Sequence, residues 1–310
     1  MTAIIDVVIV TYNGDDEVLD CLNTILSIPQ ISTTIIIDNA STISPFEKIK
    51  KRFGDNPKFV LLQNDRNVGL AAGNNLALPQ LKAPYTLILN PDTLLTEKAI
   101  VALLDVMESN CQVGAVGPLQ IYEDGVIHSS FHRNWSVLHI IIWHIIPQKI
   151  MNDVYRLLKG RFKSGAVAFV SGSCLLTRRD NLLKIGGYDE RFFLAVEDVA
   201  DLCKRITLLD RSIWLVAEAV VTHLGARSSV SVKQLSYLKG CQGHLIYSKK
   251  WFGILSQFAI FLVVLGNSVV KYSIFKIVGI IVPSFNKRAA VHSFLLVNYN
   301  KSWNWLPNSL

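Results

Sequence analysis

Acidic residues are absent from the last part of this 310-residue sequence, in which Glu218 is the final carboxylate. The residues up to Glu218 carry 21 basic and 24 acidic side chains, a net charge of −3. From Ala219 onward there are ten lysine or arginine residues and therefore a net charge of +10, which brings the whole chain to +7. Such segregation predicts an anionic partner for the C-terminal part, either nucleic acid or a membrane surface.

Cysteine is also scarce, with five scattered residues and no CxxC pair. An odd number at these spacings excludes a disulfide framework and does not indicate a zinc site, so we expect reduced thiols. Repeats and low-complexity tracts are missing as well, and 50% of the residues are hydrophobic, which excludes a disordered chain. An apolar signal-peptide core is not predicted at the N-terminus, because Asp6 interrupts it.

Short apolar, β-branched runs alternate with helical patterns from residue 4 to about 117. Strands are predicted at 4–11, 33–37, 59–62, 85–89 and 113–116, with helices at 15–27, 45–53, 70–81 and 96–109. The less regular part that follows has predicted strands at 168–177, 213–216 and 219–221, and a helix at 197–209. The alternation indicates an α/β fold built from βαβ units around a mostly parallel sheet.

Polar residues follow three of these strands, at Tyr12-Asn13, Asp38-Asn39 and Asn90-Pro91-Asp92. Because ligands of open α/β sheets bind at the carboxyl ends of the strands, we expect one site there. A carboxylate beside an amide at such a strand end suits a hard cation that also binds phosphate oxygens. Taken alone, the last of these segments is more typical of a turn before a helix capped by Thr96.

A glycine-bearing segment, NVGLAAGNN at 67–75, precedes a predicted helix. Glycines let a backbone approach a ligand closely, and a helix N-terminus favours a diphosphate, although an ordinary turn has the same pattern. The segment is neither a GxGxxG fingerprint nor a Walker A loop, which disfavours a Rossmann dehydrogenase and a P-loop enzyme.

Two adjacent carboxylates, Glu197 and Asp198, follow the apolar segment 192–196. Acids at a helix start are stabilised by the helix dipole, but acids that emerge from an apolar segment also suit a general base. His223 closes a short strand and is either a structural histidine, a metal ligand or an acid–base group. The other histidines show no metal-ligand spacing.

In chain order, these segments resemble the inverting, nucleotide-sugar-dependent glycosyltransferases of family 2, which have a GT-A fold, and their rhamnosyltransferase-like branch. The resemblance covers about residues 4–229. Its segments are VVIVTYN (7–13), IIIDNAS (35–41), NVGLAAGNN (67–75), LILNPDT (87–93), VSGSCLLTRR (170–179), GGYDERFFLAVEDVADLCKR (186–205) and the late His223.

The resemblance implies a nucleotide-sugar site in which Asp38 binds the base. The residues that it assigns to the nucleotide sugar are Thr11, Tyr12, Asn13, Asp38, Asn67, Gly69, Asn74 and Asn90. It also implies that Asp92, the second acid of a DxD-type element whose first position is Asn90, holds Mg²⁺ or Mn²⁺, with His223 as a further metal or diphosphate contact. Asp198 would be the general base, with Glu197 beside it.

The implied reaction is the transfer of a sugar, with inversion, from a nucleotide-diphospho-sugar to a hydroxyl of a glycan acceptor. One base and one metal suffice for a single displacement. The Asn90-Pro91-Asp92 variant favours L-rhamnose from dTDP-rhamnose. Other hexose donors stay open, as does a non-catalytic sugar-nucleotide-binding protein, which Asn90 would suit. A nucleotidyltransferase is disfavoured, because the turn at 12–16 is acidic and poor in glycine.

The basic C-terminal part has long apolar runs between sparse lysines, including twenty uncharged residues from Trp251 to Val270. This spacing favours a membrane over nucleic acid, whose binding faces mix basic residues with polar ones. A helix that lies on the membrane, one that spans it and one packed on the protein are all compatible with the run. The WSVLHIIIWHII segment (135–146) suits lipid contact, a buried strand or an oligomer contact.

We therefore expect a GT-A glycosyltransferase domain at 1–229, with a nucleotide-sugar half at about 1–117 and an acceptor half at about 118–229. A basic, apolar, helical extension at 230–310 would associate with the anionic cytoplasmic face of the cell membrane. A membrane-bound transferase suggests a polyprenyl-diphosphate-linked acceptor and a role in cell-surface polysaccharide synthesis, whereas the oligomeric state stays open.

Overall fold

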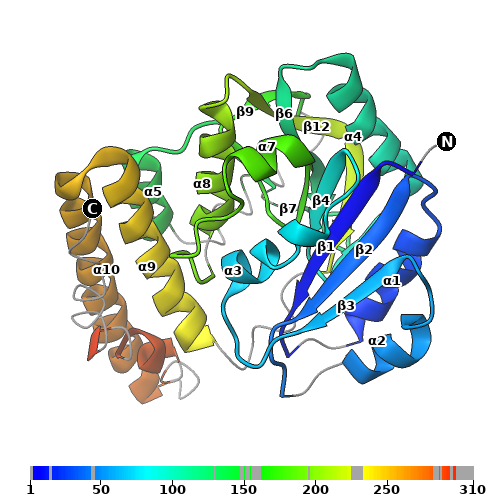
Figure 1. The fold of residues 1–310 in the computed structure, drawn as a ribbon. Coiled ribbons are helices and arrows are strands. Elements are labelled where there is room, and N and C mark those ends of the chain that lie inside the picture. Colours follow the sequence, from blue (N-terminus) through cyan, green and yellow to red (C-terminus); the bar gives the residue numbers. More distant parts are fainter. Residues whose placement is uncertain are drawn as a thin grey trace.

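A twisted β-sheet with helices on both faces forms the centre of the protein, and a helical unit lies at one side (Figure 1). The computed structural model describes residues 3–13, 16–42, 46–128, 130–146, 150, 154, 162–194, 196–224, 233–281, 286, 288–293 and 296–297. The five cysteines are free, as expected.

The N-terminal half is the predicted parallel α/β unit. Strands β1 (Ile5–Thr11), β2 (Ile31–Asp38), β3 (Phe59–Gln63) and β4 (Tyr85–Leu89) pair in parallel. Helices α1 (Glu17–Leu26), α2 (Phe46–Phe53) and α3 (Leu70–Asn75) connect them. Helix α3 is shorter than predicted and is followed by a 3₁₀ turn, Leu78–Gln80. Pro79 is consistent with the early end, because proline has no amide hydrogen to continue the helical hydrogen bonds and is tolerated at the start of a new turn.

The strand order of the whole sheet is β3-β2-β1-β4-β11-β6-β12-β5, and its second half, from β11 onward, is mixed. Strand β11 (Cys174–Arg178) pairs antiparallel with both β4 and β6 (Val113–Ile121), whereas β12 (Ser212–His223) is parallel to β6. Short strands β5 (Thr93–Leu94), β7 (Ile127–His128) and β9 (Gly165–Val167) pair antiparallel at its periphery. Strands β8 (Phe131–His132) and β10 (Phe169–Val170) form a separate pair.

Two strand predictions in this half were wrong in detail. The expected strand at 168–177 is two strands, β10 and β11, separated by a turn at 171–173. The expected strands at 213–216 and 219–221 are the single strand β12, whose register on β6 shifts between Val216 and Val220. An irregular register interrupts the apolar alternation, and alternation is the signal by which a strand is recognised in sequence.

The longer strands of the sheet contribute to two apolar cores, one on each face. In β1, Val8 and Val10 belong to one core, while Val7 and Ile9 belong to the other. Helices α1, α2 and α4 (Glu97–Ser109) cover the second core. The first core includes residues of α7 (Arg179–Lys184), α8 (Val196–Thr207) and the C-terminal helices. The predicted cap of α4 is confirmed, because Thr96 Oγ1 accepts a hydrogen bond of 3.2 Å from the Ala99 amide.

The C-terminal helices form a hairpin. Helix α9 (Lys233–Phe252) packs on α8, and α10 (Ile254–Ile281) packs on α9 and on α5 (Val137–Ile145) (Figure 1). Gly253, with a φ of +85°, makes the turn, so the uncharged run from Trp251 to Val270 is not one helix. Segment 135–146 is mainly helical, which excludes the buried strand considered for it.

Among the described residues, α10 is the one helix whose length and apolar composition would allow it to cross a membrane. Such a helix alone is weak evidence, because core helices of soluble proteins pass the same test. The domain boundary at 229/230 stays a prediction, although α9 and α10 share a core with the sheet.

Candidate active site

The carboxyl ends of β1, β2 and β3 lie in register at one edge of the sheet. Thr11 pairs with Asp38, and Asp38 pairs with Gln63. The Asn39 amide continues this pattern by donating to the Thr11 carbonyl at 2.8 Å. The parallel register therefore brings together the polar residues that follow β1 and β2, two of the three predicted polar segments.

Asn39, which was expected in the polar cluster but was assigned no role of its own, connects the loops at this edge. Its side-chain amide donates to Asn67 Oδ1 at 2.9 Å and to the Gly69 carbonyl at 3.1 Å. Its Oδ1 accepts from Asn64 Nδ2 at 2.9 Å and from the Val68 amide at 3.1 Å. Asn39 is buried, so it holds the predicted nucleotide loop from behind. In the sequence, only its position next to Asp38 indicated that Asn39 would lie at this site.

Two further predicted residues shape the neighbouring turn. Ser41 Oγ donates to Asp38 Oδ1 at 2.5 Å and accepts from the Asn13 amide at 2.8 Å. Asn13 has a φ of +46°, and its Oδ1 accepts from the Thr42 amide at 2.8 Å. These bonds fix the Asp38 carboxylate at a buried position, while Tyr12 beside Asn13 is exposed.

Gly69 brings the glycine-bearing loop against the segment that precedes α8. Its φ is +90°, and a Cβ placed on it would lie 2.7 Å from the Phe193 carbonyl oxygen. That oxygen also accepts a hydrogen bond of 2.7 Å from the Leu70 amide. Any other residue at position 69 would force the two segments apart, so the glycine here is a steric requirement.

The amide of Asn74 is directed into α3, where it donates to the Leu70 carbonyl at 2.9 Å. Asn75, which was not predicted, instead reaches the acceptor half. Its Nδ2 donates to the Tyr188 carbonyl at 2.9 Å and its Oδ1 accepts from the Tyr188 amide at 2.7 Å. Asn75 thus connects the two halves of the predicted transferase domain.

Asp92 and His223 come together, as the resemblance implied. Strand β5 pairs with the end of β12, which places His223 opposite Thr93. His223 Nε2 lies 3.2 Å from Asp92 Oδ1, and both side chains are largely buried. The Leu224 amide also donates to the Asp92 carbonyl at 2.9 Å. The sheet therefore holds a carboxylate and an imidazole side by side.

The predicted acids at the start of α8 are also buried. Asp198 Oδ1 accepts from the Val199 amide at 2.5 Å. Burial raises the pKa of Tyr188 well above its ordinary value, and the nearby Asp198 carboxylate raises it further. Tyr188 therefore stays a neutral phenol beside Asp198. Glu197 points to α9, where its Oε1 lies 2.7 Å from His244 Nε2.

The segment at 171–174 lies between the Asp92 turn and the start of α8. On one side, the Ser173 carbonyl accepts from the Asn90 amide at 3.0 Å. On the other side, a Cβ on Gly172 would lie 3.5 Å from the Val199 Cβ, directly after Asp198. The turn that carries Asp92 and the first turn of α8 thus contact the same short segment, through Asn90 and Val199.

Residues 6–186, more than half of the chain, match the model of one protein family, described as glycosyl transferase family 2. The chain belongs to glycosyl transferase family 2. The expected membership is confirmed, and so is the activity class: the protein is a glycosyltransferase. The nucleotidyltransferase and the non-catalytic protein are correspondingly disfavoured.

Two relatives of this family 2 glycosyltransferase are rhamnosyltransferases by name. The N-acetylglucosaminyl-diphospho-decaprenol L-rhamnosyltransferase of Mycobacterium tuberculosis is 29% identical over 248 residues, which cover 74% of this chain and 78% of the relative. The rhamnosyltransferase WbbL of Escherichia coli K12 is 25% identical over 149 residues, 45% of this chain and 54% of that protein.

The fold is also similar to solved glycosyltransferase structures. The mannosyltransferase PcManGT from Pyrobaculum calidifontis, solved with GDP-Man and Mn²⁺, superimposes with a TM-score of 0.59 at 12% identity. The superposition covers 99% of this chain and 89% of that one. The expected GT-A fold, a mostly parallel sheet with a C-terminal helical extension, is confirmed.

The donor set at Asp92 and His223 fits a divalent metal ion. Carboxylate oxygens suit Mg²⁺ and Mn²⁺, and such ions in transferase sites commonly complete their coordination with substrate phosphates and water. Within the described ranges, no three His, Cys, Asp or Glu residues form a metal cluster. The two side chains therefore fit a site that the diphosphate completes, and not an all-protein cage.

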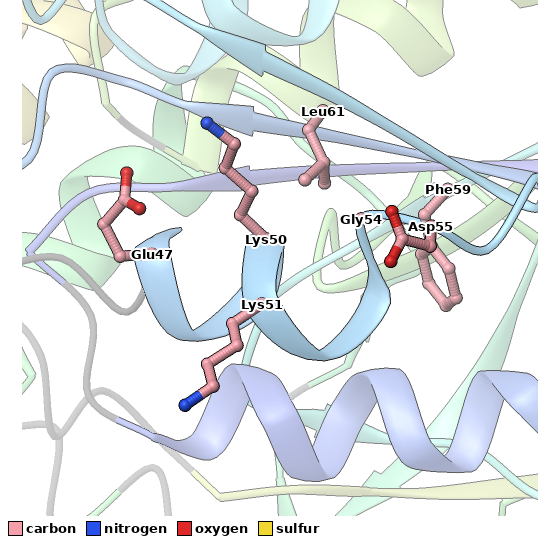
Figure 2. Close-up of a pocket in the computed structure, with 7 residues that line it drawn as sticks. All are labelled: Glu47, Lys50, Lys51, Gly54, Asp55, Phe59 and Leu61. Carbon is pink, nitrogen blue, oxygen red and sulfur yellow. The ribbon is translucent and has the colours of Figure 1, made fainter.

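A separate surface hollow of this glycosyltransferase lies between α2 and β3. Its lining residues are Glu47, Lys50, Lys51, Gly54, Asp55, Phe59 and Leu61. Figure 2 shows that the two lysine side chains extend to opposite sides of α2. The hollow contains none of the predicted site residues and lies at β3, the edge strand of the sheet, so we assign no role to it.

Proposed function

We propose that this glycosyltransferase moves L-rhamnose from dTDP-rhamnose to a hydroxyl of a lipid-linked glycan acceptor, with inversion, in cell-surface polysaccharide synthesis. The observation that carries the proposal is that the turn with the Asp92–His223 pair and the first turn of α8, which carries Asp198, contact the same segment, 171–174. The names of the two rhamnosyltransferase relatives support the choice of sugar, and the mycobacterial name supports a polyprenol-linked acceptor.

The donor would bind along the carboxyl ends of β1, β2 and β4. Asp38 would accept hydrogen bonds from the base, and the loop held by Asn39 would present backbone groups to the ribose and diphosphate. Asn90, Asp92 and His223 would face the diphosphate. A divalent cation bound there would neutralise the charge that develops on the leaving diphosphate.

Asp198 would remove the proton of the acceptor hydroxyl. Its position at the start of α8 stabilises the carboxylate, because the helix dipole favours negative charge at an N-terminus. A single base on the face opposite the leaving group produces a single displacement and hence inversion. Tyr188 stays a neutral phenol. It therefore adds a polar group near Asp198 without adding a second negative charge.

The donor and acceptor are tested together in a transfer assay with the full-length chain. We expect kcat/KM for dTDP-rhamnose and a polyprenyl-diphosphate-GlcNAc acceptor to exceed that for UDP-glucose or UDP-GlcNAc by about 10-fold or more, the discrimination that a few pocket contacts provide. Equal use of a soluble GlcNAc glycoside would contradict the lipid-linked acceptor. A preference for another nucleotide sugar would contradict rhamnose while leaving the transferase intact.

We also propose that α10 attaches the enzyme to the cytoplasmic face of the membrane by lying flat on it. Its buried stripe, which includes Gln257, Ile260 and Val264, faces the protein. The exposed side is mostly apolar and includes Ile254, Leu255, Phe258, Leu262, Val269, Val270, Ile274, Ile277, Ile280 and Ile281. On α5, Leu138, Ile142 and Ile145 are exposed too. The acid-free C-terminal part complements an anionic leaflet.

The packing of α9 favours a surface helix over a spanning one. Helix α10 lies beside α9, and Lys250 attaches α9 to Asp201 of α8 and to Asp189 in the segment before it by ionic contacts, each 2.7 Å long. If α10 crossed the bilayer, the polar α9 and part of the catalytic domain would have to enter the hydrocarbon as well. Charges there are costly, so the geometry supports an interfacial helix.

Membrane attachment is tested by flotation with vesicles of phosphatidylcholine and phosphatidylglycerol. The double variant Leu255→Glu/Leu262→Glu should bind at least about 10-fold more weakly, because each leucine side chain buried in lipid contributes about 1.5–3 kcal/mol. The matched control is Leu208→Glu, since Leu208 is 67% exposed on the catalytic domain. Equal binding of both variants would contradict the proposal, and resistance of the wild type to alkaline carbonate would indicate a spanning helix.

A further inference from the structure

His244 is a buried histidine of α9 that touches the candidate catalytic helix. Its Nε2 lies 2.7 Å from Glu197 Oε1, a close polar contact, although the two groups are not aligned as a hydrogen bond. Glu197 is completely buried, and His244 is 6% exposed. A buried carboxylate is costly unless a polar group faces it, so this contact has a strong influence on where Glu197 lies.

Helix α9 is held in register with α8 on both sides of His244. Toward its C-terminal end, Trp251 Nε1 and Lys250 Nζ reach Asp201 Oδ1 at 2.9 and 2.7 Å. Toward its N-terminal end, Lys239 Nζ lies 5.0 Å from the centre of the Phe193 ring, in the segment that contacts Gly69. The position of His244 relative to the first turn of α8 is therefore determined by contacts independent of Glu197.

A second histidine, His144, packs against the ring of His244. The rings of His144 on α5 and His244 lie 4.6 Å apart between centres, at an angle of 71°. Burial, and to a smaller extent the neighbouring His244 and Lys271, lower the pKa of His144 to about 3. His144 is thus a neutral ring at ordinary pH. Asn267 of α10 holds its backbone by donating to the His144 carbonyl at 2.8 Å.

We propose that His244 is a positioning residue for the transfer reaction: it holds the Glu197 carboxylate against α9 and so orients the first turn of α8, which carries Asp198. The inference rests on the proposed role of Asp198 as the base. It makes the C-terminal helical unit a part of the active site, although α9 lies beyond the residues that match the family model. The helices that meet the membrane would then also support the catalytic turn.

The test compares two replacements of His244 in the full-length chain. The amide nitrogen of His244→Gln reaches the position of Nε2, whereas His244→Leu fills a similar volume without a polar group. We expect His244→Leu to lower kcat by about 10- to 100-fold, as small misplacements of a catalytic group do, with the KM for dTDP-rhamnose nearly unchanged. His244→Gln should recover most of kcat. Equal losses in the two variants, or a wild-type kcat in His244→Leu, would overturn the proposal.

His292 provides the matched control, because it is a buried histidine of the same helical unit. Its ring lies 5.5 Å from that of Tyr237 and 5.7 Å from that of Phe275. His292→Leu should leave kcat unchanged, and a loss as large as that of His244→Leu would attribute both effects to general damage and overturn the proposal. An active Asp198→Asn variant would instead show that the assigned base, and not the positioning, is wrong.

Discussion

Replacement of Asp198 by asparagine should lower kcat by about 10²–10⁴-fold, the usual contribution of a general base. Asparagine keeps the size of the side chain and its ability to accept the 2.5 Å hydrogen bond from the Val199 amide, so the start of α8 should keep its structure. It cannot take the proton of the acceptor hydroxyl. Steady-state transfer of rhamnose measures kcat, and calorimetric titration measures donor affinity, which should change little.

Asp180→Asn is the control for this experiment. Asp180 is an exposed acid of α7 whose ion pair with Arg179 is 3.5 Å long, and its replacement removes the same charge at the surface. We expect wild-type activity from this control. If Asp198→Asn transfers sugar as fast as the wild type, another residue is the base. If it loses donor affinity together with activity, the carboxylate serves the donor instead.

The second large effect is expected at Asp92. Asp92→Asn keeps one oxygen near His223 but removes the charge, so the half-saturating Mn²⁺ or Mg²⁺ concentration should rise by about 10- to 100-fold. The maximal rate should fall by about 10²–10³-fold, because less charge is neutralised on the leaving diphosphate. Titration of the metal at saturating donor separates the two effects.

His223→Ala should shift the metal titration in the same direction, because the two side chains lie 3.2 Å apart. Asp105→Asn, on the exposed surface of α4, is the control for loss of a carboxylate. An unchanged metal titration in Asp92→Asn would contradict the proposed metal site. A rate that is independent of metal in the wild type would contradict the cofactor itself.

The nucleotide-sugar half was the easier part to predict from sequence. Its strands are buried on both faces, which makes them uninterrupted apolar runs, and parallel strands require the helices between them. The polar residues after these runs had to meet, because in a parallel sheet the carboxyl ends share one edge. The contact of Thr11 with Asp38 and the cap at Thr96 follow from such local rules.

The acceptor half was harder, because its chemistry depends on pairings between distant segments. Nothing near His223 in the sequence indicates that β12 would pair with β5 and bring it to Asp92; only the resemblance suggested that contact. The roles of Asn39 and Asn75 likewise appear once several loops have met. His244 carries no spacing signal at all, since its partner lies on another helix.

By itself, the sequence determined the parallel α/β half, the ordered motifs of family 2 and the separation of an acid-free, apolar C-terminal part from a mildly acidic catalytic part. These features can be predicted because hydrophobic periodicity and turn-forming residues depend on neighbours in the sequence. Only the tertiary structure decided that the long uncharged run breaks at Gly253, that α10 packs along α9, and that His244 reaches Glu197. Contacts between helices depend on how their faces pack in space, and no local pattern in the chain encodes that choice.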